Sequence, residues 1–160
     1  MDCRPETLTF VERAPFRFVN EGVMPVSAER LFAVITDTPS WPRWFVDMLE
    51  AHWTSSAPHG VGSTRTVRLK PMSVDETILV YEPGKRFSFR IDRVGLPLVR
   101  AMVEDYVIEP LGPSSSRLHV VAAYEPTVLT KALHPIVRAA FGSQFRRSVE
   151  PLAKYLEHQG

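Results

Sequence analysis

The apolar residues of this chain change their spacing late in the sequence, and this change limits the folds that the chain can adopt. Between residues 16 and 124, short runs alternate apolar and polar residues, as half-buried β-strands do. From Leu129 to Leu156 the apolar residues recur at steps of three and four, which predicts one long amphipathic helix. Hairpin-spaced strands followed by one long helix indicate an α+β fold, in which the helix covers one face of the sheet.

Turn residues mark the ends of the expected strands. The segment 7–24 looks extended, with strand character over 16–23. Glu82-Pro83-Gly84-Lys85 is a strong turn, because proline presets the second turn position and glycine allows the positive φ of the third. Pro110–Ser116 is expected to be the longest polar loop. Further strands are expected over 48–55, 63–70, 74–81, 87–91, 100–109 and 117–124.

A short helical insertion follows the first strand. Ser27 is a suitable N-cap for a helix whose apolar face carries Leu31, Phe32, Val34 and Ile35. Asp37-Thr38-Pro39-Ser40-Trp41-Pro42 ends that helix and opens a second, shorter helical turn.

Length and charge exclude several classes of protein. The 160 residues suit one domain, expected to span the whole chain with a core over about 16–157. A net charge of +1 provides no general attraction for nucleic acid or an anionic membrane. We expect neither a signal peptide nor stable membrane insertion, because no apolar run approaches the roughly 18 residues needed. Cys3 is the only cysteine, so the chain has no internal disulfide, and a cytoplasmic location is expected.

Metal and cofactor sites are not expected from the sequence. The five histidines are scattered, and no pair has i, i+4 spacing on an expected helix. Ser143 lacks the second glycine of a nucleophile elbow, and the glycines fall at turns rather than in a phosphate-binding loop.

Several local motifs, in this order, resemble the START and polyketide-cyclase superfamily, which includes the birch-pollen-type allergens. They are Val26-Ser27-Ala28-Glu29-Arg30-Leu31-Phe32, Trp41-Pro42-Arg43-Trp44, Val61-Gly62-Ser63 with Arg65, Tyr81-Glu82-Pro83-Gly84-Lys85-Arg86-Phe87 and the long terminal helix. The resemblance to a polyketide cyclase/dehydrase-like member implies a helix-grip fold, with seven antiparallel strands curved around the C-terminal helix and two short helices after the first strand. It also implies a hydrophobic cavity between sheet and helix, but it does not fix the function.

Strand alternation indicates which side chains face such a cavity. The expected inward set is mostly apolar with three ionisable members. It comprises Arg65, Val67 and Leu69; Val74, Glu76, Ile78 and Val80; Phe87, Phe89 and Ile91; and Met102, Glu104, Tyr106 and Ile108.

The ionisable members have two interpretations. Arg65 and Glu76 lie on consecutive strands, so they can form a structural ion pair or a polar anchor that orients a ligand oxygen. Glu104 is a candidate general acid or base if burial raises its pKa, with Tyr106 as a second candidate.

The strand over 117–124 can face the cavity with either side. Its apolar content favours Leu118, Val120, Ala122 and Tyr124 as the inward face. The opposite register would place His119 in the cavity as a third catalytic candidate, although a lone histidine on a strand is more often a surface residue.

Aromatic residues complete the expected ligand-binding set. The resemblance places Trp44 and Phe45 beside the cavity mouth, where the alternative is a purely structural role. Phe141 and Phe145, with Ile136, are expected to form the wall on the C-terminal helix. The set is Trp44, Phe45, Arg65, Val67, Leu69, Glu76, Ile78, Phe89, Tyr106, Tyr124, Ile136, Phe141 and Phe145.

Three functional hypotheses follow. The first is a protein that binds a medium-sized hydrophobic or aromatic small molecule, of lipid, polyketide or isoprenoid type, in its cavity. The second is an enzyme of polyketide cyclase, aromatase or dehydrase type, in which Glu104, Tyr106 or His119 moves a proton. The third is a protein-interaction module, for which the cavity should be closed. Edge strands and a low net charge also allow a homodimer.

Overall fold

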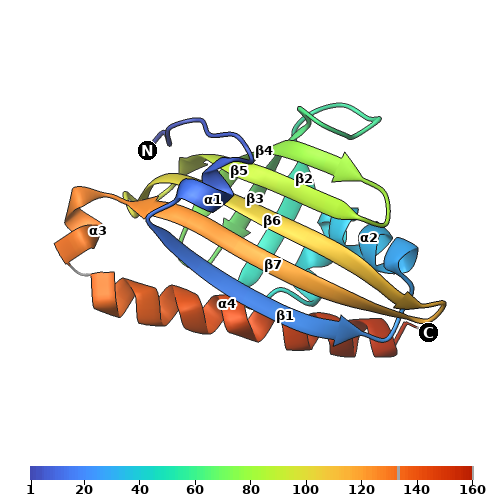
Figure 1. The fold of residues 1–160 in the computed structure, drawn as a ribbon. Helices are drawn as coiled ribbons and strands as arrows, with labels where there is room; N and C mark the ends of the chain where they lie inside the picture. Colours follow the sequence, from blue (N-terminus) through green and yellow to red (C-terminus); the bar gives the residue numbers. More distant parts are fainter. Residues whose placement is uncertain (133, 160) are drawn as a thin grey trace.

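The computed structural model describes residues 1–132 and 134–159, and from 132 to 148 it describes side chains only at 135 and 139. The described residues form a curved antiparallel sheet of seven strands, in the order β1-β7-β6-β5-β4-β3-β2 (Figure 1). The predicted helix-grip architecture is therefore confirmed. The strands are β1 Phe16–Met24, β2 Met48–Trp53, β3 Thr64–Leu69, β4 Ser73–Glu82, β5 Arg86–Val94, β6 Val99–Gly112 and β7 Ser115–Pro126; the helices are α1 Phe10–Arg13, α2 Ala28–Thr36, the 3-10 helix η1 Thr38–Arg43, α3 Val128–Ala132 and α4 His134–Glu157.

Helices α2 and η1 form the expected insertion between β1 and β2. Ser27 caps α2 as predicted, because its hydroxyl oxygen accepts a hydrogen bond from the backbone nitrogen of Arg30 at 3.3 Å. The indole nitrogen of Trp41 donates to the carbonyl oxygen of Ile35 at 2.9 Å, which ties η1 back onto α2. The Trp41 ring is thereby held in the core, where it is 2% exposed.

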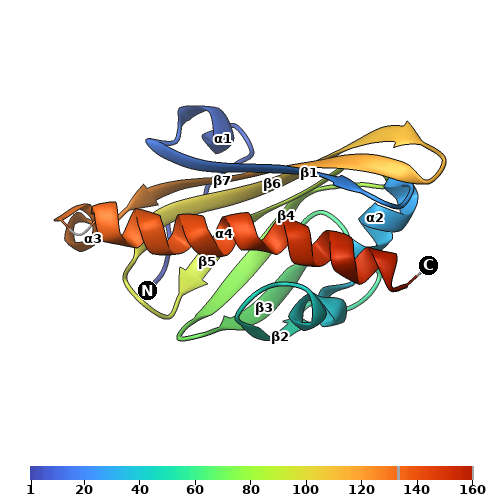
Figure 2. The ribbon, with the colours of Figure 1, turned by 90° about the horizontal axis from the view of Figure 1, so that it is seen from below.

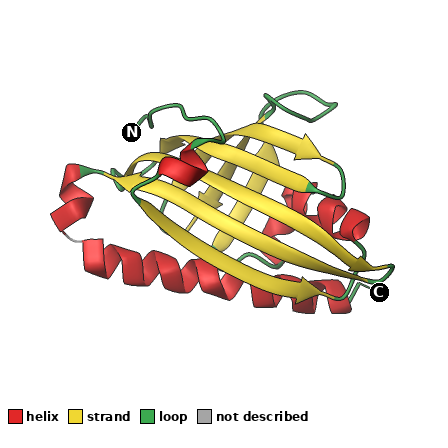
Figure 3. Ribbon diagram, viewed as in Figure 1, coloured by secondary structure: helices red, strands yellow, loops and turns green. Residues whose placement is uncertain are grey.

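Helix α4 crosses the concave side of the sheet beside β1, whereas α1 lies on the opposite side (Figure 2). Its described apolar side chains Val149, Leu152 and Leu156 are buried in the main core. Figure 3 shows the resulting layers, with strands between the long helix and the short N-terminal one. The change of spacing at the end of the sequence thus corresponds to the change from sheet to covering helix.

Gly22 of β1 makes the close approach between the sheet and α4 possible, which leads to a testable prediction. A Cβ atom added at Gly22 would lie 2.5 Å from Cγ1 of Val149, a short and stiff side chain. We expect Gly22→Ala to lower the free energy of unfolding by about 1–3 kcal/mol through overpacking, measured by urea denaturation. Adding Val149→Ala should recover part of the loss, whereas Gly60→Ala, where no atom lies within 4 Å, is the control. A Gly22→Ala protein as stable as the control would contradict this close packing.

The expectation of extended structure throughout 7–24 was wrong at its start. Residues Phe10–Arg13 form α1, and Phe10 packs with Val103 and Val121 on the convex face of the sheet. Glu6 is also buried, and its carboxylate pairs with the guanidinium groups of Arg4 and Arg13. A single turn of helix is too short for a periodic apolar pattern, so its position depends on the sheet surface that it covers.

The predicted long loop at Pro110–Ser116 was also wrong. The strands continue through it to Gly112 and restart at Ser115, and Glu109 and Pro110 pair with Arg117 and Ser116. This end of the β6–β7 hairpin is partly exposed. Strands can pair there through backbone hydrogen bonds without apolar side chains, so the polar sequence did not reveal the pairing.

A bulge in β4 reverses the predicted orientation of Val80. The register shifts between Ile78 and Val80, so that Val80 pairs with Ser88 and Tyr81 pairs with Phe87. Tyr81 rather than Val80 therefore packs against the main core, and its ring lies 6.0 Å from that of Phe87.

Candidate functional site

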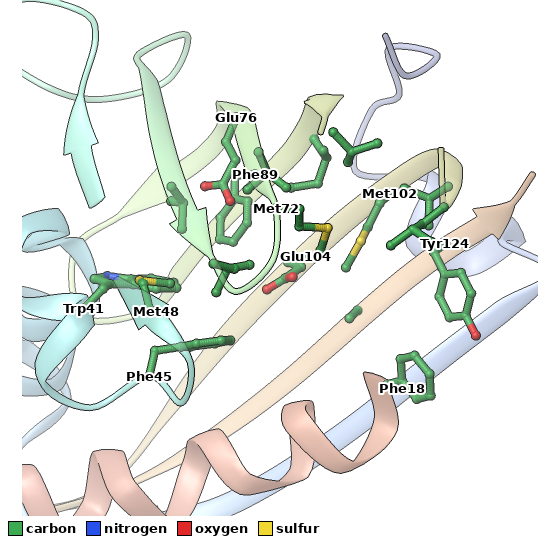
Figure 4. A pocket seen from close by; sticks show the side chains of 18 of the residues that line it. Phe18, Trp41, Phe45, Met48, Met72, Glu76, Phe89, Met102, Glu104 and Tyr124 are labelled. Atoms are coloured by element: carbon green, nitrogen blue, oxygen red, sulfur yellow. The ribbon is translucent and has the colours of Figure 1, made fainter. Parts of the chain in front are cut away.

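A largely apolar cavity lies on the concave side of the sheet (Figure 4). About 90 Å³ of it is open to the centres of water molecules, far more than the roughly 10–15 Å³ that one water needs. Every strand contributes to the wall, because alternate side chains of a curved sheet converge on its concave face. The lining residues are Phe18, Trp41, Phe45, Met48, Val67, Leu69, Met72, Val74, Glu76, Phe89, Ile91, Val94, Leu98, Val99, Met102, Glu104, Ala122, Tyr124 and Thr130.

Seven of the sequence-predicted site residues line this cavity. Alternation placed those on the strands correctly, and Tyr124 with Ala122 decides the open question of which face of β7 points inward. The seven are Phe45, Val67, Leu69, Glu76, Phe89, Glu104 and Tyr124.

Four other predicted residues are buried behind the lining rather than in it. Ile78 and Trp44 belong to the main core, and the Trp44 ring centre lies 4.8 Å from that of Trp41. Arg65 and Tyr106 are also buried, and each contacts a carboxylate that does line the cavity. The side chains of Ile136, Phe141 and Phe145 lie outside the described part of α4.

His119 is not in the cavity, which corrects its candidacy as a catalytic residue there. The neighbouring Leu118 and Val120 are buried inward, so His119 points to the other face, with 42% of its side chain exposed. Its Nδ1 lies 3.4 Å from a carboxylate oxygen of Glu21 on β1.

Several lining residues were missed or only partly anticipated. Phe18 lies on the more buried face of β1, whose residues alternate in burial along the strand. Alternation could therefore have identified it. Met48 and Met72 gave no such signal, because one starts a short edge strand and the other lies in the β3–β4 turn. Thr130 reaches the cavity from α3, where its hydroxyl donates to the carbonyl oxygen of Leu98 at 2.6 Å.

Arg65 and Glu76 form the predicted ion pair across β3 and β4. Nε of Arg65 donates to Oε2 of Glu76 at 2.5 Å, and the two residues are paired in the sheet register. The guanidinium carbon also lies 4.2 Å from the ring centre of Trp41 and 4.5 Å from that of Phe89. The arginine is fully buried, and its Nη2 atom has no hydrogen-bond partner in the described part of the chain.

Glu104 is the second carboxylate at the cavity wall. The hydroxyl of Tyr106, two residues along β6, donates to its Oε2 at 3.0 Å. Burial, and next the charge of Glu76, raise the pKa of Glu104 to about 7, against the opposing effects of Tyr106 and Arg65. Burial also raises the pKa of Glu76, although Arg65 opposes this. At neutral pH, Glu104 can therefore both donate and accept a proton.

No group of three or more metal-binding side chains occurs among the residues that the structure describes. Within the same residues, none of the helices is both long and apolar enough to span a membrane.

Comparisons with known proteins agree with this fold. A family model described as polyketide cyclase / dehydrase and lipid transport matches residues 15–157. The uncharacterized protein Rv2574 of Mycobacterium tuberculosis is 31% identical over 156 residues, which cover 97% of this chain and 93% of that protein.

Solved structures show the same architecture at low sequence identity. A START superfamily protein from Mycobacterium smegmatis has a TM-score of 0.77 at 15% identity, over 90% of this chain and 99% of that one. The ZhuI aromatase/cyclase from Streptomyces sp. R1128 also has a TM-score of 0.77, at 9% identity over 90% and 94% of the two chains. At these identities the similarity is one of fold alone.

Proposed function

Because the chain belongs to the polyketide cyclase/dehydrase and lipid transport family, we propose that it binds a medium-sized hydrophobic or aromatic molecule in the cavity between the sheet and α4. The molecule would be of lipid, polyketide or isoprenoid type. The observation that carries this proposal is the cavity itself, whose apolar lining comes from all seven strands and contains few polar groups. An apolar cavity with a few convergent polar groups is the usual form of a small-molecule site. We also propose that residues 1–160 form a single domain around it, with a core over about 16–157.

A filled-cavity variant tests this proposal. The uncharged fluorescent naphthalene ketone prodan should bind saturably, with a blue shift of its emission. Ala122 is 1% exposed and lines the cavity, so Ala122→Leu places three extra carbon atoms there and should weaken binding by about tenfold or more. Ala33→Leu on the exposed side of α2 is the control and should bind as the wild type does.

Absence of saturable binding, or binding that Ala122→Leu leaves unchanged in a folded protein, would refute the proposed site. Circular dichroism establishes that the variant is folded, and Met102→Trp is a second way to fill the same cavity.

A polyketide cyclase-type enzyme is the second candidate, and the Glu104–Tyr106 contact favours it. A carboxyl group with a pKa of about 7, beside a phenol hydroxyl, is suited to general acid–base catalysis. A poly-β-ketone thioester that is turned over by the wild type, and bound but not turned over by Glu104→Gln, would support catalysis. Equal losses of binding and turnover would count against it. A protein-interaction module is not favoured, since that hypothesis expected a closed cavity.

A further inference from the structure

The ionisable side chains with carboxyl groups in the described cavity lining are those of two glutamates. Glu76 from β4 and Glu104 from β6 present carboxylates, which Figure 4 shows among the lining side chains. The other polar side chains of the lining are the hydroxyls of Tyr124 and Thr130 and the indole of Trp41, whose nitrogen already donates to Ile35. No lysine, arginine or histidine is present among the described residues of the lining.

The charges around this wall do not balance within the described residues. Arg65 directs Nε to Glu76 and Nη1 to the hydroxyl of Thr38 at 3.4 Å, and it lies between aromatic rings behind the lining. Its positive charge is therefore matched by Glu76. Glu104 accepts its described hydrogen bond from the uncharged phenol of Tyr106, and the charge of Arg65 acts on it only without a direct contact. A carboxylate in a largely apolar wall, with no counter-ion in direct contact, takes up a proton or binds a cation.

The apolar part of the wall is suited to a ligand that carries a cationic group on an apolar skeleton. The rings of Trp41, Phe45 and Phe89 present π-systems, which attract cations placed over their faces. Met48, Met72 and Met102 add flexible, polarisable thioethers, which adapt to irregular shapes. A carboxylate or phosphate ligand would instead add a negative charge beside Glu76 and Glu104, where no described lining residue offers a positive one.

We infer that the ligand is an amphipathic amine, whose apolar body fills the cavity and whose protonated nitrogen pairs with the carboxylate of Glu104. This inference rests on the proposed binding function and narrows it to one class of ligand. The contact would be a charge-assisted hydrogen bond in a site of low polarity, where such bonds are strongest.

The pH dependence of binding follows from the groups that face Glu104. Among the described side chains these are Arg65 from β3, Glu76 from β4, Tyr106 on its own strand and Tyr124 from β7. Because the pKa of Glu104 is about 7, the carboxylate needed for the amine is a minority form below neutral pH. Amine affinity should therefore increase as the pH rises through 7, and the affinity of an uncharged ligand should not.

Three ligands with the same body test this inference by isothermal titration calorimetry on the whole chain. They are 2-naphthylmethylamine, 2-naphthylmethanol and 2-naphthoic acid. At pH 8 the amine should bind at least about tenfold more tightly than the alcohol, and the acid should bind most weakly. At pH 6 the amine should bind about tenfold more weakly than at pH 8, in proportion to the ionised fraction of Glu104.

A variant of Glu104 identifies the group responsible. In Glu104→Gln the amine should bind only as tightly as the alcohol and its pH dependence should disappear, since the amide keeps the side-chain shape but carries no charge. Glu109→Gln, at an exposed position of the same strand, is the control and should keep the preference.

The outcomes separate this inference from the proposed function. Alcohol or acid binding as tight as amine binding, or a preference that persists in Glu104→Gln, would overturn the amine assignment while leaving cavity binding intact. If Glu104→Gln does not fold, comparing the affinities of the wild-type protein for the three ligands at the two pH values still tests the amine assignment. Failure of all three naphthalene ligands and of prodan would overturn the proposed function itself.

Discussion

Replacing Arg65 with methionine should lower the free energy of unfolding at pH 7 by about 3–5 kcal/mol, since it breaks a buried ion pair and leaves one charge without a partner. Arg65 is fully buried and Glu76 is 4% exposed, so the pair lies in a site of low polarity, where the loss of the guanidinium is poorly compensated. The Glu76 carboxyl would have to take up a proton or remain as an uncompensated charge. The loss should therefore be smaller at low pH, where Glu76 is protonated in both the folded and the unfolded chain.

Removing both charges should restore much of this stability. In Arg65→Met/Glu76→Leu no charge remains to be buried, and buried ion pairs are often replaced by apolar residues at little cost. Arg68→Met is the matched control, because Arg68 lies on the same strand, is 58% exposed and pairs with exposed Glu50. Urea denaturation followed by tryptophan fluorescence measures all four proteins.

Two results would contradict this account of the ion pair. An Arg65→Met protein no less stable than Arg68→Met would mean that the Arg65–Glu76 pair contributes little to the free energy of unfolding. A double variant as unstable as the single one would assign the loss to the packing of the guanidinium against Trp41 and Phe89 instead.

Stability should also depend on pH through Glu104. Its pKa is about 7 in the folded protein, against the ordinary value of 4.5 for a glutamate in water. A raised pKa means that the folded state binds the proton more tightly than the unfolded state. The resulting stability is fully present below about pH 4.5 and is lost as the pH rises through 7.

The comparison with Glu104→Gln isolates this effect from the other carboxylates. The stability of the variant relative to the wild type should rise by about 2–3 kcal/mol between pH 5 and pH 8. Urea denaturation at several pH values measures the difference, and Glu109→Gln controls for the loss of one exposed carboxylate. A difference that stays constant over this range would show that burial does not hold the proton on Glu104.

The sequence determined features that depend on neighbours along the chain. Ser27 caps α2 through a contact three residues away, and Glu82–Lys85 forms its turn through the conformational preferences of proline and glycine. The pairing of Arg65 with Glu76 was predictable as well, because consecutive antiparallel strands are usually adjacent. Alternation along the five strands from β3 to β7 then identified about half of the lining residues.

Only the tertiary structure decided features that depend on a partner surface. The bulge after Ile78, which turns Val80 away from the core, depends on the register of β5. Phe10 is placed by the convex face of β6 and β7, and Met72 reaches the cavity from a turn without any periodic signal. Packing between strands also decided that Glu104 lines the cavity, whereas Arg65 is buried behind the lining. Local sequence specifies which residues alternate, but which charged side chains of the described residues meet in the cavity wall depends on which strands are neighbours there.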